Sequence, residues 1–130
     1  MPSWLPYVLV GVGGCLGSVT RFAVARYIGG VVDARFPLGT FVINMTASFL
    51  LGVVGSIVAA RVSPTSEAIR VAIGVGFIGG YSTFSTLEYE THNLLEAGEL
   101  LMGLANAIGS LALGMVAVRL GVVFGRWWIT

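Results

Sequence analysis

The densest polar chemistry in this chain lies within an otherwise apolar stretch, GFIGGYSTFST, at residues 76–86. Two glycines, Gly79 and Gly80, precede a group of hydroxyl side chains around Phe84 that consists of Ser82, Thr83, Ser85 and Thr86. Hydroxyl and backbone N–H groups can donate hydrogen bonds to an anion, whereas freed backbone carbonyls can coordinate a cation. The stretch therefore predicts an ion-binding segment, unless its hydroxyls only bond back to their own helix at a glycine-rich crossing.

Two further sets of polar and small residues recur every four positions, which places each set along one side of a helix. The first set is Thr40, Asn44, Ser48, Gly52 and Ser56, and the second is Asn106, Ser110 and Gly114. An asparagine amide inside a membrane helix is costly unless another group bonds it. Both sets therefore predict either a polar pathway or hydrogen bonds that hold helices together.

The ionisable residues near these sets form no catalytic arrangement. Glu88 and Glu90 are two positions apart, so they point in different directions on a helix, and His92 is expected near the membrane surface. The single Cys15 allows neither an intramolecular disulfide nor a cysteine metal cluster. Since no nucleophile is paired with a base, the sequence does not favour an enzyme.

Membrane helices are predicted to position these residues. Hydrophobic residues make up 56% of the 130-residue chain and charged residues 10%, against about 25% charged in soluble domains. A membrane helix needs about 20 apolar residues, and four segments satisfy this requirement, roughly 5–27, 38–60, 68–95 and 100–124. We expect one all-α integral membrane domain over residues 1–130, with the third helix broken near Gly79-Gly80 because glycine weakens a helix.

Small residues and charges indicate how these helices assemble. Gly13 and Gly17 are four positions apart, as are Gly14 and Ser18, and this spacing permits close helix contact in lipid. All seven basic residues are arginines, and about four of them fall at the end that holds the termini, against two or three at the other. So small a difference predicts insertion in both orientations. Four short helices enclose little space, so we expect an oligomer, and the net charge of +1 gives no indication of nucleic acid.

Four segments, taken in order, resemble the Fluc (CrcB) family of fluoride channels. They are GGCLGSVTR at 13–21, PLGTFVIN at 37–44, GFIGGYSTFST at 76–86 and NAIGS at 106–110, and the resemblance covers essentially the whole chain. It implies four-helix subunits in the inner or plasma membrane that form an antiparallel dual-topology dimer, either a homodimer or a heterodimer with a homologous subunit. It also implies passive export of toxic cytoplasmic fluoride through two pores per dimer.

The resemblance further implies roles for individual residues. Asn44, Phe84 and Ser110 match residues of the fluoride pore, and Asn106 matches a position in the polar track of the fourth helix. Fluoride is small and strongly hydrated, so its dehydration needs dense donors. Hydroxyls and amides at several weak sites suit its passage, and the hydroxyls of Thr83 and Ser85 are expected to add to this set.

The remaining implied roles concern a cation and two charged side chains. Gly79 and Ser82 match positions whose backbone carbonyls bind a structural sodium ion at the dimer interface. Arg21 matches an arginine of the first helix, and Glu90 matches a carboxylate near the end of the third.

One pore position departs from the family pattern. The family has TFSTF where this chain has TFSTL at residues 83–87, so Leu87 occupies the place of a second phenylalanine. A leucine lacks the electropositive ring edge that can face an anion. Either Phe84 alone suffices, or the pore conducts differently, or the chain pairs with a non-identical partner.

Two other functions remain open on the residues alone. A small four-helix proton-coupled multidrug transporter would also use dual topology, but it needs a carboxylate deep in the membrane, and the second helix has no charge. A membrane subunit with only an assembly or regulatory role would account for the small-residue packing. Fluoride efflux and growth of a fluoride-sensitive cell separate these functions from a channel.

Overall fold

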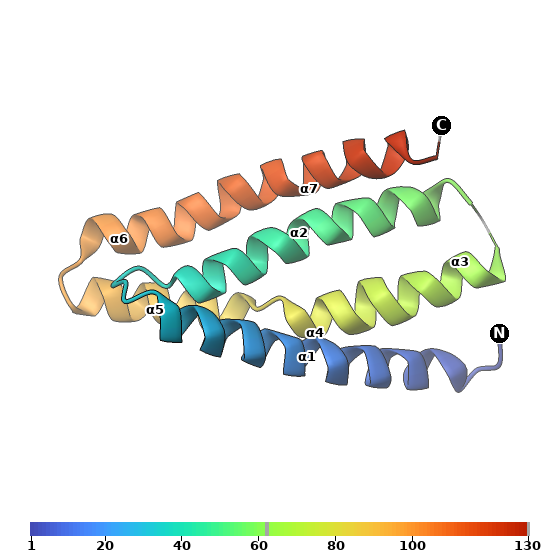
Figure 1. The fold of residues 1–130 in the computed structure, drawn as a ribbon, viewed down its shortest axis with the longest axis horizontal. Helices are drawn as coiled ribbons and strands as arrows, with labels where there is room; N and C mark the ends of the chain where they lie inside the picture. Colours follow the sequence, from blue (N-terminus) through green and yellow to red (C-terminus); the bar gives the residue numbers. More distant parts are fainter. Residues whose placement is uncertain (62, 130) are drawn as a thin grey trace.

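Four helical rods make up the computed structural model, which describes residues 1–61 and 63–129 (Figure 1). The first two rods are α1 (Leu5–Val31) and α2 (Leu38–Ala59). The third consists of α3 (Pro64–Ile69), η1 (Arg70–Ile78) and α4 (Gly79–Tyr81), followed after an interruption by α5 (Phe84–Glu96). The fourth consists of α6 (Leu100–Leu104), η2 (Ala105–Gly109) and α7 (Ser110–Trp127). The segments η1 and η2 are π-helical, a conformation that recurs at functional sites.

The rods run alternately up and down, so both termini lie at one end of the bundle and the connections 32–37 and 97–99 lie at the other (Figure 1). Within the described residues, three helical stretches are long and apolar enough to cross a membrane, namely Leu5–Val31, Leu38–Ala59 and Leu100–Trp127. The third rod consists of shorter pieces because it is interrupted. The prediction of an all-helical membrane protein with four helical segments is confirmed.

Local sequence signals explain where the third rod begins and ends. The Ser63 hydroxyl accepts a hydrogen bond from the Ser66 backbone N–H at 3.1 Å, and a proline opens the first turn. A hydrogen bond from Arg70 lowers the pKa of the neighbouring Glu67 carboxyl. At the other end Gly98 has a φ of 79°, a left-handed conformation that glycine adopts without strain, and it turns the chain into α6.

Glycines bring α1 against the third rod. A Cβ on Gly13 would overlap the backbone of Ala72, and a Cβ on Gly17 would overlap the backbone of Phe77. A Cβ on Gly80 would lie 2.6 Å from the carbonyl oxygen of Gly14. The prediction of close helix contact from the small residues of α1 is therefore confirmed.

Glycines also close α2 onto α7. A Cβ on Gly52 would overlap the Val118 carbonyl oxygen, and a Cβ on Gly121 would overlap that of Phe49. Backbones that approach this closely leave no room for water or an ion. The α2–α7 contact around Gly52 and Gly121 is therefore dry. Any polar space between these helices must lie nearer to α5 and η2.

Candidate functional site

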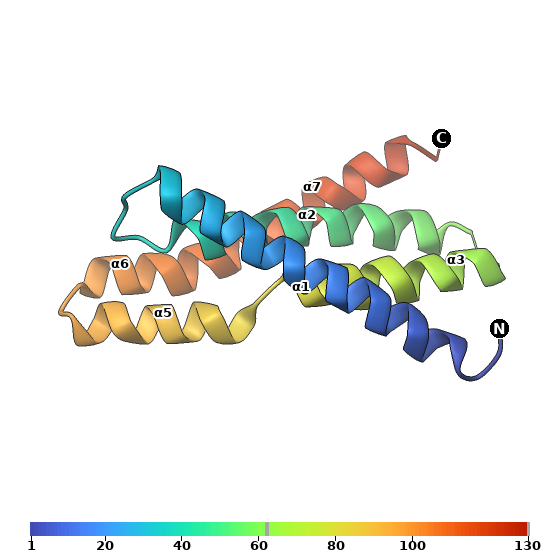
Figure 2. The same cartoon turned by 60° about the horizontal axis from the view of Figure 1, so that its bottom comes forward.

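The third rod is interrupted at Ser82 and Thr83, which separate α4 from α5 by a short extended segment (Figure 2). Ser82 has a ψ of 158° and Thr83 a φ of −150°, both outside the helical range. The break thus lies near the predicted glycine pair, but Gly79 and Gly80 themselves remain helical in α4. Gly80 serves the close contact with Gly14 instead.

Asn44 on α2 holds this break in place. Its side-chain Nδ2 donates a hydrogen bond to the Thr83 carbonyl oxygen at 3.0 Å, and its Oδ1 accepts one from the Thr83 backbone N–H at 2.9 Å. Both backbone groups of Thr83 would otherwise lack a partner within the bundle. Because the amide NH₂ has two hydrogens, one of them remains available to another acceptor.

The Thr83 side chain starts α5. Its hydroxyl accepts a hydrogen bond from the Thr86 backbone N–H at 3.3 Å and donates one to the Thr86 hydroxyl at 2.8 Å. This is the arrangement of a helix N-cap. The hydroxyl proton of Thr83 is therefore directed to Thr86, and not to the space between the helices.

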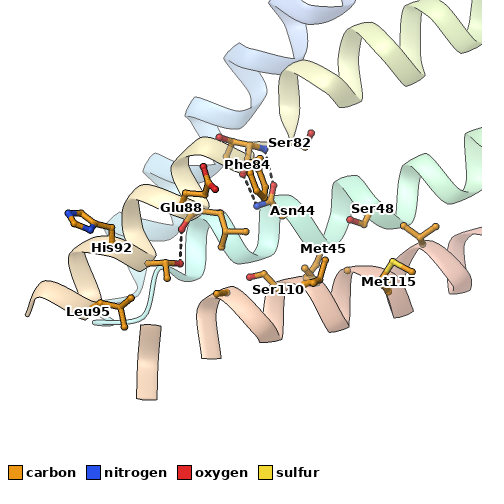
Figure 3. Close-up of a pocket in the computed structure, with 17 residues that line it drawn as sticks. Asn44, Met45, Ser48, Ser82, Phe84, Glu88, His92, Leu95, Ser110 and Met115 are labelled. Atoms are coloured by element: carbon orange, nitrogen blue, oxygen red, sulfur yellow. Dashed lines mark hydrogen bonds between the residues drawn. The ribbon is translucent and has the colours of Figure 1, made fainter. Parts of the chain in front are cut away.

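A cavity of about 700 Å³ lies beside the break, between α2, α5 and the fourth rod (Figure 3). Its lining combines polar and apolar side chains: Asn44, Met45, Ser48, Ser82, Thr83, Phe84, Leu87, Glu88, Thr91, His92, Leu95, Ala107, Ser110, Leu111, Gly114, Met115 and Val118. The Phe84 and Met115 side chains are 71% and 67% exposed, so the cavity is open on their side.

The predicted pore residues are only partly brought together. Asn44, Thr83, Phe84, Leu87 and Ser110 all line the cavity, and the Ser110 hydroxyl is buried without a hydrogen-bond partner among the described residues.

Asn106 and Ser85 lie outside the cavity lining. Asn106 is fully buried, and its Nδ2 donates to the Thr91 hydroxyl at 3.0 Å, which ties η2 to α5. Ser85 is exposed on another side of α5.

The ionisable side chains of the cavity lining lie at one end of the cavity. Glu88 and His92 line it near the 97–99 end, both with exposed side chains, and His92 lies 3.6 Å from Glu96. None of the lining residues is basic other than His92, so the cavity does not hold an anion by a fixed positive charge.

Arg21 and Glu90 do not line the cavity. Glu90 accepts a hydrogen bond from the Thr40 hydroxyl at 2.8 Å, which bridges α5 and α2, and its other carboxylate oxygen is buried without a partner among the described residues. The Arg21 Nε on α1 is likewise buried without one. As the sequence predicted, Glu88 and Glu90 point in different directions.

The end of α4 presents backbone carbonyls. The last carbonyls of a helix have no partner within the helix. Among the described residues, the Ile78 carbonyl alone accepts a bond from the segment that follows α4, from the Ser82 N–H at 2.9 Å. A Cβ on Gly79 would meet nothing within 4 Å, so its surroundings in the single chain are open. These carbonyls, at the negative end of a helix dipole, could hold a cation.

Several lining residues carry no motif that singles them out. Met45, Thr91 and Leu111 belong to no recognisable ion-binding pattern, and only their positions in the fold bring them to the cavity. Ser48 does carry a signal, because it follows Asn44 by one turn in the four-residue polar set of α2.

The fold and site together define a small helical membrane protein with a cavity of mixed polar and apolar lining beside a broken helix. A family model described as "CrcB-like protein, Camphor Resistance (CrcB)" matches residues 8–122, and the chain belongs to this family. It is 39% identical over 122 residues to a fluoride-specific ion channel FluC of Solibacter usitatus, covering 94% of this chain and 99% of the relative. Proteins of the same name from Acidobacterium capsulatum and Geotalea daltonii are 43% and 36% identical, over 94% and 92% of this chain and 97% and 96% of the relatives.

Proposed function

We propose that this chain is the subunit of a fluoride-selective channel that lets toxic fluoride leave the cell passively across the inner or plasma membrane. Family membership and the name of the relatives, fluoride-specific ion channel, support this proposal. The same observations favour a channel over an enzyme, over a multidrug transporter and over a subunit with only an assembly role.

One structural observation supports the proposal most directly: Ser110 lines a cavity whose lining has no arginine, and its buried hydroxyl has no hydrogen-bond partner among the described residues. This hydroxyl and the spare N–H of Asn44, both from residues of the lining, provide neutral donors for a dehydrated anion. Neutral donors bind an anion weakly enough to release it, as conduction requires. The Phe84 ring, also in the lining, can direct its electropositive edge at the ion.

We further propose that the channel is an antiparallel dual-topology dimer, of two copies or of this chain and a homologous subunit. Support comes from the open side of the cavity, beside the exposed Phe84 and Met115, where Asn44, Ser48 and Ser110 contribute polar groups to the lining. Polar groups and non-helical backbone at membrane depth need to be covered by protein or to line a water-filled space. A second subunit against the open side of the cavity, next to the exposed Phe84, would close a pore on that side.

The break in the third rod would also hold a structural sodium ion between the subunits. Sodium is a hard cation that suits carbonyl oxygens, and the break offers those of Gly79 in α4 and of Ser82 just after it. One chain supplies only these two ligands, so a second copy would be needed to complete the site. In this role the ion would fix the two breaks against each other.

The multidrug-transporter alternative finds no support in the cavity. Glu88 is its only carboxylate, and this side chain is exposed near the 97–99 end. Proton-coupled transport of a cation needs a carboxylate deep in the membrane.

Efflux from liposomes tests the proposed function. The purified chain, reconstituted alone, is expected to release trapped potassium fluoride when valinomycin is added, as followed with a fluoride electrode, and to release chloride poorly. Empty liposomes provide the baseline. Fluoride release no faster than that baseline, from protein that is folded and monodisperse before reconstitution, would refute the proposal for the homomeric protein.

A further inference from the structure

The cavity extends one helical turn past Asn44 along α2, to a level at which a single hydroxyl is available. At this level Ser48 of α2 faces Gly114 of α7, and Met115 and Val118 continue the α7 side of the lining (Figure 3). Gly114 has no side chain, and the other two α7 residues are apolar. An anion that enters this part of the cavity therefore meets one side-chain donor, the Ser48 hydroxyl.

The Ser48 hydroxyl is free, unlike those of its neighbours on α2. Thr46 donates to the Val42 carbonyl at 2.8 Å, and Ser56 donates to the Val53 carbonyl at 2.8 Å. The half-buried Ser48 has no hydrogen bond to any residue in the described part of the chain. A serine in a membrane helix ordinarily bonds to a carbonyl of its own helix, so a hydroxyl left free beside a cavity is available to a ligand.

Gly114 leaves space directly opposite this hydroxyl. A Cβ built on Gly114 would lie 3.6 Å from the Ser48 Oγ and 3.6 Å from the Met45 Cε, which is ordinary van der Waals contact. A small side chain at position 114 would therefore fit, and its γ-oxygen would lie at the level of Ser48. The two helices can thus supply a hydroxyl to the same part of the cavity from opposite sides.

Beyond this level the helices close. Gly52, one turn after Ser48, packs directly on the Val118 backbone, and Gly121 packs on that of Phe49. Ser48 is consequently the last donor of the α2 polar set before a dry contact.

We infer that Ser48 is a specificity-determining residue for fluoride: its free hydroxyl donates to the partly dehydrated ion at the level where α7 presents Gly114. This inference rests on the proposed function and adds to it a donor beyond Asn44 and Ser110. A small, strongly hydrated ion depends on such a donor more than a larger halide does, because its dehydration is costlier. Loss of the hydroxyl therefore slows fluoride more than chloride.

The test compares fluoride efflux from liposomes for wild type, Ser48→Ala, and the double variant Ser48→Ala/Gly114→Ser. Ser48→Ala is expected to lower the fluoride rate about fivefold, the order of effect of losing one hydrogen bond, and to lower the ratio of fluoride to chloride rates. Restoring a hydroxyl from α7 in the double variant is expected to recover most of the rate. Ser56→Ala is the matched control, because its hydroxyl bonds to its own helix, outside this cavity, and it should conduct like wild type.

A structural role is separated from this one by thermal unfolding of the same purified proteins. Because the Ser48 hydroxyl forms no hydrogen bond with the described residues, Ser48→Ala should keep the wild-type Tm. Ser48→Ala with wild-type fluoride flux, or a flux loss that follows a lowered Tm and is not recovered by Gly114→Ser, overturns the role of Ser48 and leaves the channel intact. A wild-type protein without fluoride efflux overturns the proposed function for the homomeric protein, and the role of Ser48 in it.

Discussion

Asn44→Ala removes the two hydrogen bonds that connect α2 to the break in the third rod. The Asn44 amide bonds both the N–H and the carbonyl of Thr83, at 2.9 and 3.0 Å, in a half-buried position. A hydrogen bond between protein groups contributes about 1 kcal/mol net to stability, and interhelical bonds in membranes somewhat less on average. Two lost bonds that strand two backbone groups should destabilise the fold by about 2 kcal/mol. This corresponds to a roughly thirtyfold change in the unfolding equilibrium.

Reversible unfolding in mixed micelles, followed by circular dichroism, measures this loss. Asn93→Ala is the matched control, since Asn93 is exposed on α5 and its side chain forms no hydrogen bond with the described residues. Asn44→Ala should unfold at clearly lower denaturant content, whereas Asn93→Ala should behave like wild type. Equal unfolding of the two variants would contradict the view that Asn44 holds the break.

Three further outcomes follow from particular contacts. Thr83→Ala removes the N-cap of α5 and should cost about 1 kcal/mol of stability, while Thr83→Ser should retain it, as thermal unfolding of both would reveal. Gly17→Ala drives a Cβ into the Phe77 backbone and should cost about 1–3 kcal/mol in the same measurement, whereas Gly11→Ala meets nothing within 4 Å and should cost nothing. Leu87→Phe adds an aromatic edge to the cavity lining and should raise fluoride efflux by roughly twofold or more without raising chloride efflux; unchanged or lower fluoride efflux would contradict the need for a second aromatic edge.

Hydropathy and spacing were sufficient to predict the four rods. Each predicted segment agrees with its rod to within a few residues at most ends, because apolar length, prolines and glycines fix helix boundaries in a membrane protein. The four-residue spacing in α1 predicted its close packing, since a backbone contact needs glycine at successive turns. The hydroxyl-rich stretch likewise predicted an interrupted third rod.

The position of the break could not be derived from local preferences. Gly79 and Gly80 are the poorest helix formers of the stretch, yet they remain helical while Ser82 and Thr83 become extended. The Asn44 amide, 39 residues away in sequence, stabilises the extended form by bonding Thr83. A tertiary hydrogen bond thus outweighs the intrinsic helix propensities of this stretch. Because its two partners lie in different helices, no pattern within one segment predicts this bond.

The sequence also does not reveal which hydroxyls bond to the protein and which line the cavity. Thr83 and Ser85 are two residues apart, and the sequence predicts that both donate to the ion. In the structure the Thr83 hydroxyl caps α5, and Ser85 is exposed outside the lining. Ser110 and Ser48, one on each of two facing helices, have hydroxyls without a hydrogen-bond partner in residues 1–61 and 63–129.

The central claim is that fluoride passes through the cavity between α2, α5 and the fourth rod. Ala107 lines this cavity, whereas Ala112 is exposed and does not line it, so Ala107→Phe and Ala112→Phe are the same change at two sites of one rod. The most direct measurement is fluoride efflux from liposomes containing equal amounts of either folded variant. Ala107→Phe should abolish efflux, and Ala112→Phe should retain it. Undiminished efflux through Ala107→Phe would contradict the assignment of this cavity as the path.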